Sequence, residues 1–292
     1  MSQFSRFLLR QRIAAVELSH WLGARIGTGR GTTSNNRKIP VIVTLTTIPE
    51  RLEKVSSAIE SLLRQDVKPD GIILWLGKSL AKKPLPFSLR RQIKRGLEIR
   101  FVEDVGPHTK VIYALQEFPD CLVVSCDDDS LYSQGWLKEL LDGHQRHPDC
   151  VVCHRARQMA LGRDGELLPY VKWKLVRSTV PSFSIFPVCV AGILYPPGLL
   201  HREVFNVDIF RKTCPKADDV WMKAMSLLNN VRCHSISEFP RQFLLVNGTQ
   251  AKSLWSENRL GGNDTQLRAV FEHYNLFGHL RQNDFVREDA AV

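Results

Sequence analysis

Three consecutive aspartates, Asp127-Asp128-Asp129, follow the apolar run from Cys121 to Cys126. In an open α/β sheet, ligands bind beyond the carboxyl ends of the strands. Adjacent carboxylates at such a place repel one another unless a cation lies among them, and oxygen ligands suit Mg²⁺ or Mn²⁺ shared with substrate phosphates. The triplet therefore predicts a divalent-metal site. The alternative is a solvated acidic turn, or the cap of a helix over 131–141.

A second acidic pair, Asp218-Asp219, stands directly before Val220-Trp221-Met222, where a helix is expected to begin. Aspartate is a preferred helix cap, and this is the structural explanation of the pair. A carboxylate can also act as the general base that removes a proton from a hydroxyl group. Capping accounts for one carboxylate more readily than for two, so we favour the catalytic interpretation.

Four basic residues are candidates for binding a diphosphate group: Arg51, Lys110, Arg155 and Arg157. Arg51 and Lys110 gain most from their position, because each follows a junction between a strand and a helix. The alternative is that they belong to a solvated surface. The formal net charge of +10 and the pI of about 9.4 indicate anionic partners, such as nucleic acid, anionic lipid or a diphosphate substrate.

The elements that must position these side chains alternate between strands and helices from Pro40 onward. We expect strands over 41–46, 72–76, 97–102 and 121–126, with helices over 49–64, 88–95 and 109–118. This alternation predicts an α/β fold with a mostly parallel sheet covered on both faces. Further along we expect a helix at 135–146, a strand at 150–154, loops over a site at 181–198, a helix at 219–228, a strand at 231–236 and a helix at 265–273.

Residues 1–26 have apolar side chains at roughly helical spacing with arginines between them, which predicts a basic amphipathic helix. Residues 27–38 are small and polar and predict a linker. Such a helix could lie on an anionic membrane surface, or dock on the main domain or a second subunit. We expect the helix and linker at 1–38, one domain at 39–280 and a tail at 281–292.

The seven cysteines lie mostly in apolar runs and predict buried, reduced thiols. Cys150 and Cys153 have C-x-x-C spacing, but no second such motif completes a metal site. The sequence has no apolar run of membrane-spanning length and no secretory signal at its start. We therefore expect a cytoplasmic protein, with peripheral association at the inner face of the membrane as a further hypothesis.

Several motifs in this order resemble a bacterial group of family-2-like glycosyltransferases of surface polysaccharide or lipopolysaccharide assembly. The resemblance covers about residues 40–275. Its motifs are Thr44-Leu-Thr-Thr-Ile-Pro-Glu-Arg51, Lys110-Val-Ile-Tyr-Ala-Leu with Phe118-Pro-Asp120, Cys126-Asp-Asp-Asp129 with Tyr132 and Trp136, Gly192-Ile-Leu-Tyr-Pro-Pro-Gly198, Cys214-Pro-Lys-Ala-Asp-Asp-Val-Trp221, and Ser253-Leu-Trp-Ser-Glu-Asn258 with Asn263-Asp264. One difference is that Gly192 follows Val190-Ala191 in place of another small, glycine-rich pair.

The resemblance implies a GT-A type fold, a D-x-D metal site and a nucleotide-diphospho-sugar donor, for which a UDP-sugar is the first candidate. Asp127 approaches the ribose in this interpretation, Asp127 and Asp129 bind the metal, and Asp128 lies with the donor. Asp218 or Asp219 is the base of an inverting transfer to a glycan or lipid-linked glycan. The remaining implied positions are Thr46, Pro49, Arg51 and Lys110 for the donor, and His234 as a late metal ligand.

Two alternatives to this function stay open. A nucleotidyl- or phosphotransferase also uses clustered aspartates on an α/β sheet, although the P-loop motif is absent. A basic protein that binds membrane surfaces or nucleic acid would explain the charge. The basic residues are spread along the chain and no nucleic-acid motif is visible, so we expect no nucleic-acid partner.

Overall fold

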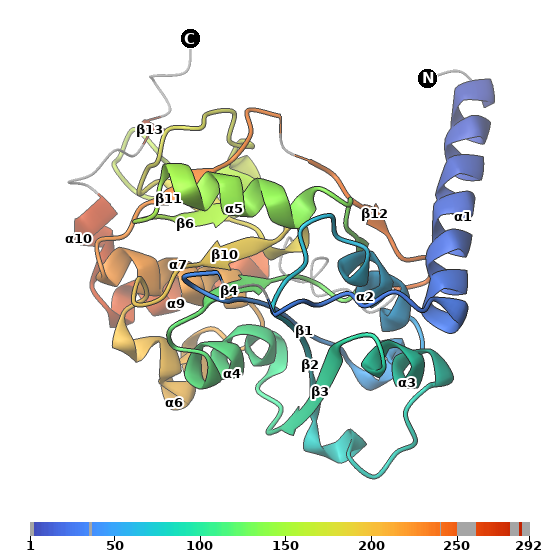
Figure 1. Cartoon of the computed structure of the whole chain (residues 1–292). Coiled ribbons are helices and arrows are strands. Elements are labelled where there is room, and N and C mark those ends of the chain that lie inside the picture. The colour runs from blue at the N-terminus through green and yellow to red at the C-terminus, as the bar shows by residue number, and fades with distance from the viewer. Residues whose placement is uncertain (1–2, 35–36, 240, 250–260, 281–285, 288–292) are drawn as a thin grey trace.

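The computed structural model describes residues 3–34, 37–239, 241–249, 261–280 and 286–287. Its centre is a seven-stranded sheet with the order β11-β6-β10-β4-β1-β2-β3 (Figure 1). The strands are β1 (Val41–Thr46), β2 (Gly71–Gly77), β3 (Leu97–Val102), β4 (Leu122–Ser125), β6 (Val151–Cys153), β10 (Ile193–Tyr195) and β11 (Cys233–Ser235). Among these strands β10 alone is antiparallel to its neighbours, β4 and β6.

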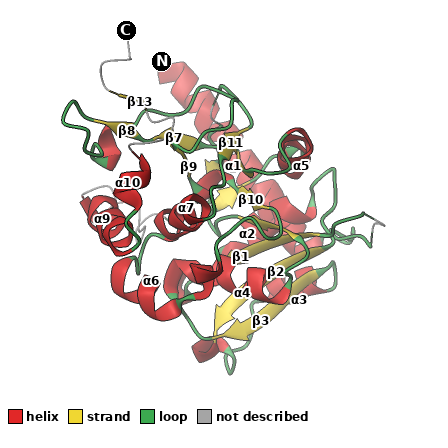
Figure 2. Ribbon diagram, turned by 90° about the vertical axis from the view of Figure 1, so that its left-hand side faces the viewer, coloured by secondary structure: helices red, strands yellow, loops and turns green. Residues whose placement is uncertain are grey.

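Helices cover both faces of this sheet because its buried strands carry apolar side chains on both sides. On β1, Val43 and Leu45 pack with helices α2 and α5, whereas Ile42 packs with α4. Figure 2 shows the sheet between these layers. The helices are α2 (Val55–Leu63), α3 (Phe87–Ile93), α4 (Thr109–Glu117), α5 (Trp136–Arg146), α6 (Val207–Thr213), α7 (Asp218–Leu228), α9 (Asn263–His273) and α10 (Leu276–Leu280).

Short strands and 3-10 turns complete the described chain. The strand pairs are β5 (Ser130–Leu131) with β12 (Leu244–Leu245), β7 (Ala156–Gln158) with β9 (Ile185–Pro187), and β8 (Ala160–Leu161) with β13 (Val286–Arg287). The 3-10 turns are η1 (Pro49–Arg51), η2 (Lys78–Leu80), η3 (Gly106–His108), η4 (Tyr170–Lys172), η5 (Cys189–Ala191) and η6 (Arg202–Phe205).

The predicted α/β class, the mostly parallel sheet, the helices on both faces and the N-terminal helix are confirmed. The segment 181–198 differs from the prediction, because it supplies β9 and the central strand β10 and is not loop throughout. Strand β10 has only three residues and lies between Gly192 and Pro196, so its apolar run is too short to signal a strand. The expected helix at 49–64 divides into η1 and α2, and α6 was not predicted.

The N-terminal helix α1 (Gln3–Ile26) packs against α2 and α3 near its carboxyl end (Figure 1). Gly23 permits a close approach, since a Cβ there would lie 2.0 Å from the Nη2 atom of Arg64. The following residues 27–34 have no regular structure, and Gly31 N and Thr33 N donate hydrogen bonds to the domain. Within the described residues, no helix has the combination of length and apolar character that crossing a membrane requires.

Candidate active site

The aspartate triplet lies at the carboxyl end of β4, in the middle of the sheet. The chain places Asp128 and Asp129 in largely buried positions, with exposed fractions of 7% and 8%. These values contradict the alternative of a solvated acidic turn. The triplet is not a helix cap either, because α5 begins at Trp136 with Gly135 in the capping position.

Arg51 and Thr47 hold Asp128 from the end of the neighbouring strand β1. The Oδ1 atom of Asp128 lies 2.7 Å from Nη1 of Arg51, and its Oδ2 atom accepts a hydrogen bond of 2.5 Å from the hydroxyl of Thr47. The same guanidinium nitrogen lies 3.2 Å from Oδ2 of Asp129. Burial raises the pKa of Asp128, although Thr47 and Arg51 oppose the shift. Arg51 thus links the first turn after β1 to the triplet.

Lys110 joins the two acidic motifs of the sequence. Its Nζ atom lies 2.8 Å from Oδ1 of Asp127 and 2.9 Å from Oδ2 of Asp218. The first turn of α4 carries this lysine beneath the end of β4, where only 6% of the residue is exposed. Burial alone would lower the pKa of Lys110, but the two carboxylates outweigh it and hold the pKa well above its ordinary value. The ammonium group therefore stays charged.

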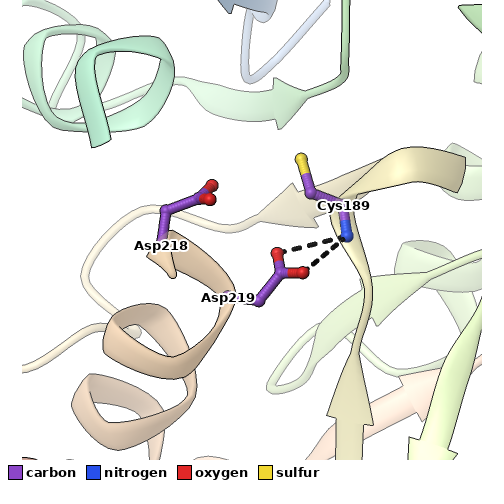
Figure 3. A group of neighbouring side chains, drawn as sticks. All are labelled: Cys189, Asp218 and Asp219. Atoms are coloured by element: carbon purple, nitrogen blue, oxygen red, sulfur yellow. Dashed lines mark hydrogen bonds between the residues drawn. The ribbon is translucent and has the colours of Figure 1, made fainter. Parts of the chain in front are cut away.

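Asp218 and Asp219 form the first turn of α7, but neither side chain caps it. Ala217 occupies the capping position and receives no side-chain cap. Asp218 points toward Lys110, whereas Asp219 accepts hydrogen bonds of 3.2 and 3.3 Å from the backbone N–H of Cys189 (Figure 3). Burial raises the pKa of Asp219 well above its ordinary value, and Asp218 raises it further against the opposing effect of Lys110. The capping explanation of this pair is therefore wrong.

The turn before β10 closes the site next to the triplet. Strand β10 is antiparallel, so it begins at the edge where β4 ends, with Ile193 opposite Ser125. The hydroxyl of Tyr132 accepts a 2.9 Å hydrogen bond from the backbone N–H of Asp127 and lies 3.3 Å from the carbonyl oxygen of Val190. Tyr132 thereby ties the triplet to the turn that carries Cys189.

The site gathers carboxylate oxygens, the ligands that a hard divalent cation prefers. Five carboxylates gather here, and their ion pairs with described residues come from two cations, Lys110 and Arg51. An excess of partly buried negative charge is relieved by binding a cation or by retaining protons. Asp127 is the most accessible member of the triplet, with 28% of its side chain exposed against 11% for Asp129. All-oxygen ligands of this kind fit Mg²⁺ or Mn²⁺.

A second set of groups has ligand atoms close enough for a metal ion. The sulfur of Cys189 and carboxylate oxygens of Asp218 and Asp219 all lie within 4.8 Å of one another (Figure 3). Burial raises the pKa of the Cys189 thiol well above its usual range, and a protonated thiol is a poor metal ligand. The triplet is therefore the better candidate for a hard divalent cation.

The remaining predicted residues lie in different places. Thr46 is partly buried and donates its hydroxyl to the carbonyl of Trp75, while Pro49 is exposed at the start of η1, beside Arg51. His234 is not brought to the triplet, because β10 and β6 lie between β11 and β4. Its ring packs against His147 with 4.4 Å between centroids, and burial lowers its pKa to about 4. The motif Ser253–Asn258 lies outside the described residues.

Two residues of the site escaped the sequence analysis. Thr47, not its neighbour Thr46, donates a hydrogen bond to Asp128. Its position directly after strand β1 could have suggested this role. Cys189 contributes through its backbone N–H, for which its residue type gives no signal. Six of the seven cysteines are buried, as expected, and Cys121 is partly buried.

No protein-family model matches the chain, and no curated protein sequence matches it. Solved structures give matches at low identity. The mannosyltransferase PcManGT from Pyrobaculum calidifontis, in complex with GDP-Man and Mn²⁺, has 11% identity and a TM-score of 0.49 over 92% of this chain and 74% of its own. S. aureus TarS in complex with UDP has 15% identity and a TM-score of 0.44 over 70% of this chain and 59% of its own.

A third match is the CMP:2-keto-3-deoxy-manno-octonic acid synthetase in complex with CTP. It has 11% identity and a TM-score of 0.40 over 68% of this chain and 89% of its own. These structures thus include a mannosyltransferase with GDP-Man and Mn²⁺, a protein with bound UDP and a synthetase with bound CTP. All three TM-scores lie below 0.5, so the function of this chain has to be inferred from its own residues.

Proposed function

We propose that the chain is a glycosyltransferase that moves a sugar from a nucleotide-diphospho-sugar to an acceptor hydroxyl. The observation that carries the proposal is the convergence of Asp127 and Asp218 on the buried Lys110 at the carboxyl end of β4. A transferase of this class needs a cationic, metal-compatible place for the donor diphosphate and a base beside it. Lys110 joins the triplet to Asp218, and Asp219 stands next to Asp218 in the first turn of α7.

The donor diphosphate lies at the triplet, with Asp127 and Asp129 as the residues that hold a divalent cation. A bound Mn²⁺ or Mg²⁺ would stabilise the charge that develops on the leaving diphosphate. Asp128 is turned toward Arg51 and Thr47, so its role is to fix the turn that presents its two neighbours. Arg51, Thr46 and Pro49 border the nucleotide, and a UDP-sugar is the first donor to test.

Asp219 is the stronger candidate for the base, because Asp218 is engaged by Lys110. A carboxylate whose pKa is raised well above its ordinary value is a stronger base than an ordinary aspartate. The hydroxyl attacks the sugar as its proton passes to Asp219, and the bond to the diphosphate breaks on the opposite side. This in-line arrangement inverts the configuration of the sugar carbon. It places the GT-A type fold and the D-x-D motif of the resemblance in one mechanism.

The decisive test is the identity of the released product. We expect the protein, incubated with UDP-sugars, Mn²⁺ and a mixture of glycan acceptors, to release free UDP. A nucleotidyltransferase would release pyrophosphate from a nucleoside triphosphate, and this result would overturn the proposal. Thermal stabilisation by nucleotide sugars with Mn²⁺ identifies the donor before an acceptor is known.

The metal assignment has its own test. We expect Asp129→Asn to weaken the affinity for Mn²⁺, measured by electron paramagnetic resonance, and to lower the transfer rate. The matched control is Asp149→Asn, which removes the same charge at a residue in the turn after α5. Unchanged binding of Mn²⁺ by the Asp129 variant would remove that residue from the metal site.

The surroundings of α1 favour an acceptor at an anionic membrane surface, as in cell-surface glycan synthesis. Four apolar side chains on its described part are exposed: Leu18, Trp21, Leu22 and Ile26. Leu18, Leu22 and Ile26 border a surface hollow of about 490 Å³ beside Arg64. The helix sequence contains four arginines and one glutamate, which complements anionic lipid headgroups.

A further inference from the structure

Two arginines follow strand β6 on the far side of Asp219 from the aspartate triplet. Arg155 precedes β7 and Arg157 lies within it, two residues apart, so they project to the same face of the strand. Both are partly buried. Within the described part of the chain, neither forms an ion pair with a carboxylate. Arg155 donates to the backbone carbonyl of Arg241 at 3.4 Å, and Arg157 donates to that of Trp173 at 2.7 Å. Arg157 also forms a hydrogen bond with the side chain of Tyr170.

The two guanidinium groups affect one another. Burial and the neighbouring charge of Arg157 both lower the pKa of Arg155 from its ordinary value. An adjacent, partly buried pair of like charges is unfavourable unless an anion binds between them or beside them. The sequence around the pair does not offset it, because residues 150–201 contain six lysines and arginines but two acidic residues, Asp164 and Glu166.

Backbone hydrogen bonds connect the arginine pair to the proposed base. The N–H of Val188 donates to the carbonyl of Arg155 at 3.0 Å, and the N–H of the next residue, Cys189, donates to Asp219. Tyr170 interacts electrostatically with both groups. The carboxylate of Asp219 raises its pKa, after the larger effect of burial, while Arg157 and Arg155 lower it. The guanidinium carbon of Arg157 is 4.9 Å from the centre of the Tyr170 ring.

The position of the pair distinguishes it from the place proposed for the donor diphosphate. Strand β10 separates β6 from β4, so the end of β6 lies two strand spacings, about 10 Å, from the end of β4. Asp219 lies between these two strand ends in the site, held by the turn before β10. A group bound at the arginines therefore lies at the end of β6, apart from the place proposed for the diphosphate at the end of β4.

We propose that Arg155 and Arg157 bind an anionic group, a phosphate or carboxylate, carried by the acceptor. The inference rests on the proposed function, since it names the class of acceptor for that site. The planar guanidinium groups suit a phosphate or carboxylate because each can donate two parallel hydrogen bonds. The acceptor is therefore an acidic or phosphorylated glycan whose free hydroxyl lies next to Asp219.

The test uses glucose 6-phosphate as the probe and glucose as its neutral control, both titrated calorimetrically with saturating UDP and Mn²⁺ present. The nucleotide occupies the donor site, so the probe reports on the remaining anion site. We expect wild-type protein to bind glucose 6-phosphate more tightly than glucose. R155Q/R157Q should weaken that binding by about tenfold or more and leave the binding of UDP unchanged. R202Q/R268Q, which removes two exposed arginines, is the matched control.

Each other outcome overturns a defined part of the proposal. Unchanged binding of glucose 6-phosphate by R155Q/R157Q, or no preference of the wild type for it over glucose, removes the anion site. A parallel loss of UDP binding assigns the arginines to the donor diphosphate. If UDP never binds but glucose 6-phosphate binding depends on the arginines, the proposed function fails while the anion site stands. Circular dichroism checks folding, and single R155Q and R157K variants replace the double variant should it not fold.

Discussion

Lys110 is the cation on which both acidic motifs of the site depend, because it lies between Asp127 and Asp218 with little exposure. Removing one member of a buried ion pair leaves the other charges without compensation, at a cost on the order of 3 kcal/mol. We expect Lys110→Met to lower the free energy of unfolding by about that amount. We also expect a fall in transfer rate of about a hundredfold, because Asp127 and Asp218 lose the ammonium group that holds them in place.

Lys110→Arg is the control, since it keeps the charge but changes its shape. It should restore most of the stability, measured by urea unfolding. The interpretation fails if Lys110→Met unfolds at the same urea concentration as the wild type, because Asp127 and Asp218 would then not need the ammonium group.

The raised pKa of Asp219 should make stability and activity change in opposite directions with pH. Its pKa is raised in the folded protein, so the folded state holds a proton that the unfolded state releases at lower pH. The stability that this proton contributes is present at low pH and is lost as pH rises from the ordinary aspartate value through the raised one. We expect the transfer rate to increase over the same window, because the base form is then available.

Asp219→Asn tests both consequences. The variant should lose activity and should also lose this decline of stability with pH, seen in urea unfolding at pH 5 and pH 8. Asp208→Asn, in the first turn of α6, removes a carboxylate from outside the site and is the control. A wild type whose stability does not fall relative to the Asn variant as pH rises would show that the carboxyl group is not protonated.

At the scale of the elements, Gly192 allows the turn before β10 to pass α5. Its φ of +98° lies in a region that side chains disfavour, and a Cβ there would lie 2.5 Å from the ring of Trp136. That ring cannot move away freely, because its Nε1 donates a 2.7 Å hydrogen bond to the carbonyl of Ala191. We expect Gly192→Ala to lower the free energy of unfolding by roughly 2–4 kcal/mol, from backbone strain and overpacking together.

The same substitution should also lower the transfer rate, since the turn carries the Cys189 N–H that donates to Asp219. Denaturant unfolding and the transfer rate measure the two effects. Gly165→Ala is the matched control, because its φ is also positive, at +78°, but a Cβ there would meet no atom within 4 Å. Equal losses for the two variants would show that strain alone acts and that contact with Trp136 does not.

A buried carboxylate connects α1 to the domain. Glu60 on α2 is 1% exposed and pairs with Arg95 at 2.6 Å and Arg64 at 2.8 Å. These arginines donate in turn to backbone carbonyls of α1, those of Gly23 and Ser19. We expect Glu60→Ala to cost about 3–5 kcal/mol, since it leaves Arg95 buried without its carboxylate, and to make residues 27–34 sensitive to protease.

Limited proteolysis at several temperatures measures this second effect. Glu98→Ala, which removes an exposed partner of Arg100, is the control and should change little. If the protease cuts the Glu60→Ala variant within residues 27–34 no faster than it cuts the control, α1 is held by its apolar contacts and not by this ion-pair network.

At the scale of the whole molecule, the sequence predicts best those features of the fold that depend on a single strand or helix. The runs of β1, β2 and β4 are apolar on both faces, so their strands and the sheet could be predicted, and the triplet could be placed at a strand end. The residues that contact the triplet could not be predicted from the sequence. The choice of Thr47 over Thr46, and the contact of Cys189 with Asp219, depend on how separate elements meet. Strand β10 shows the same limit, because its pairing with β4 and β6 outweighs its weak local signal.

The exposed side of α1 gives the last prediction, which concerns how the whole protein meets its acceptor. Trp21 and Leu22 are 45% and 40% exposed beside the Arg25 guanidinium, which lies 3.9 Å from the Trp21 ring centre. Apolar side chains flanked by arginines bind anionic bilayers through both burial and charge. We expect the protein to sediment with vesicles containing phosphatidylglycerol and to be released by high salt, which screens the charges.

Trp21→Ser with Leu22→Ser should weaken this binding at least tenfold, because two apolar side chains that would be buried in the bilayer are lost. Val180→Ser with Phe205→Ser changes two exposed apolar residues outside α1 and should leave binding unchanged. Equal binding by both double variants would show that the net charge alone attracts the protein to the vesicles, and α1 would then be only a docked helix.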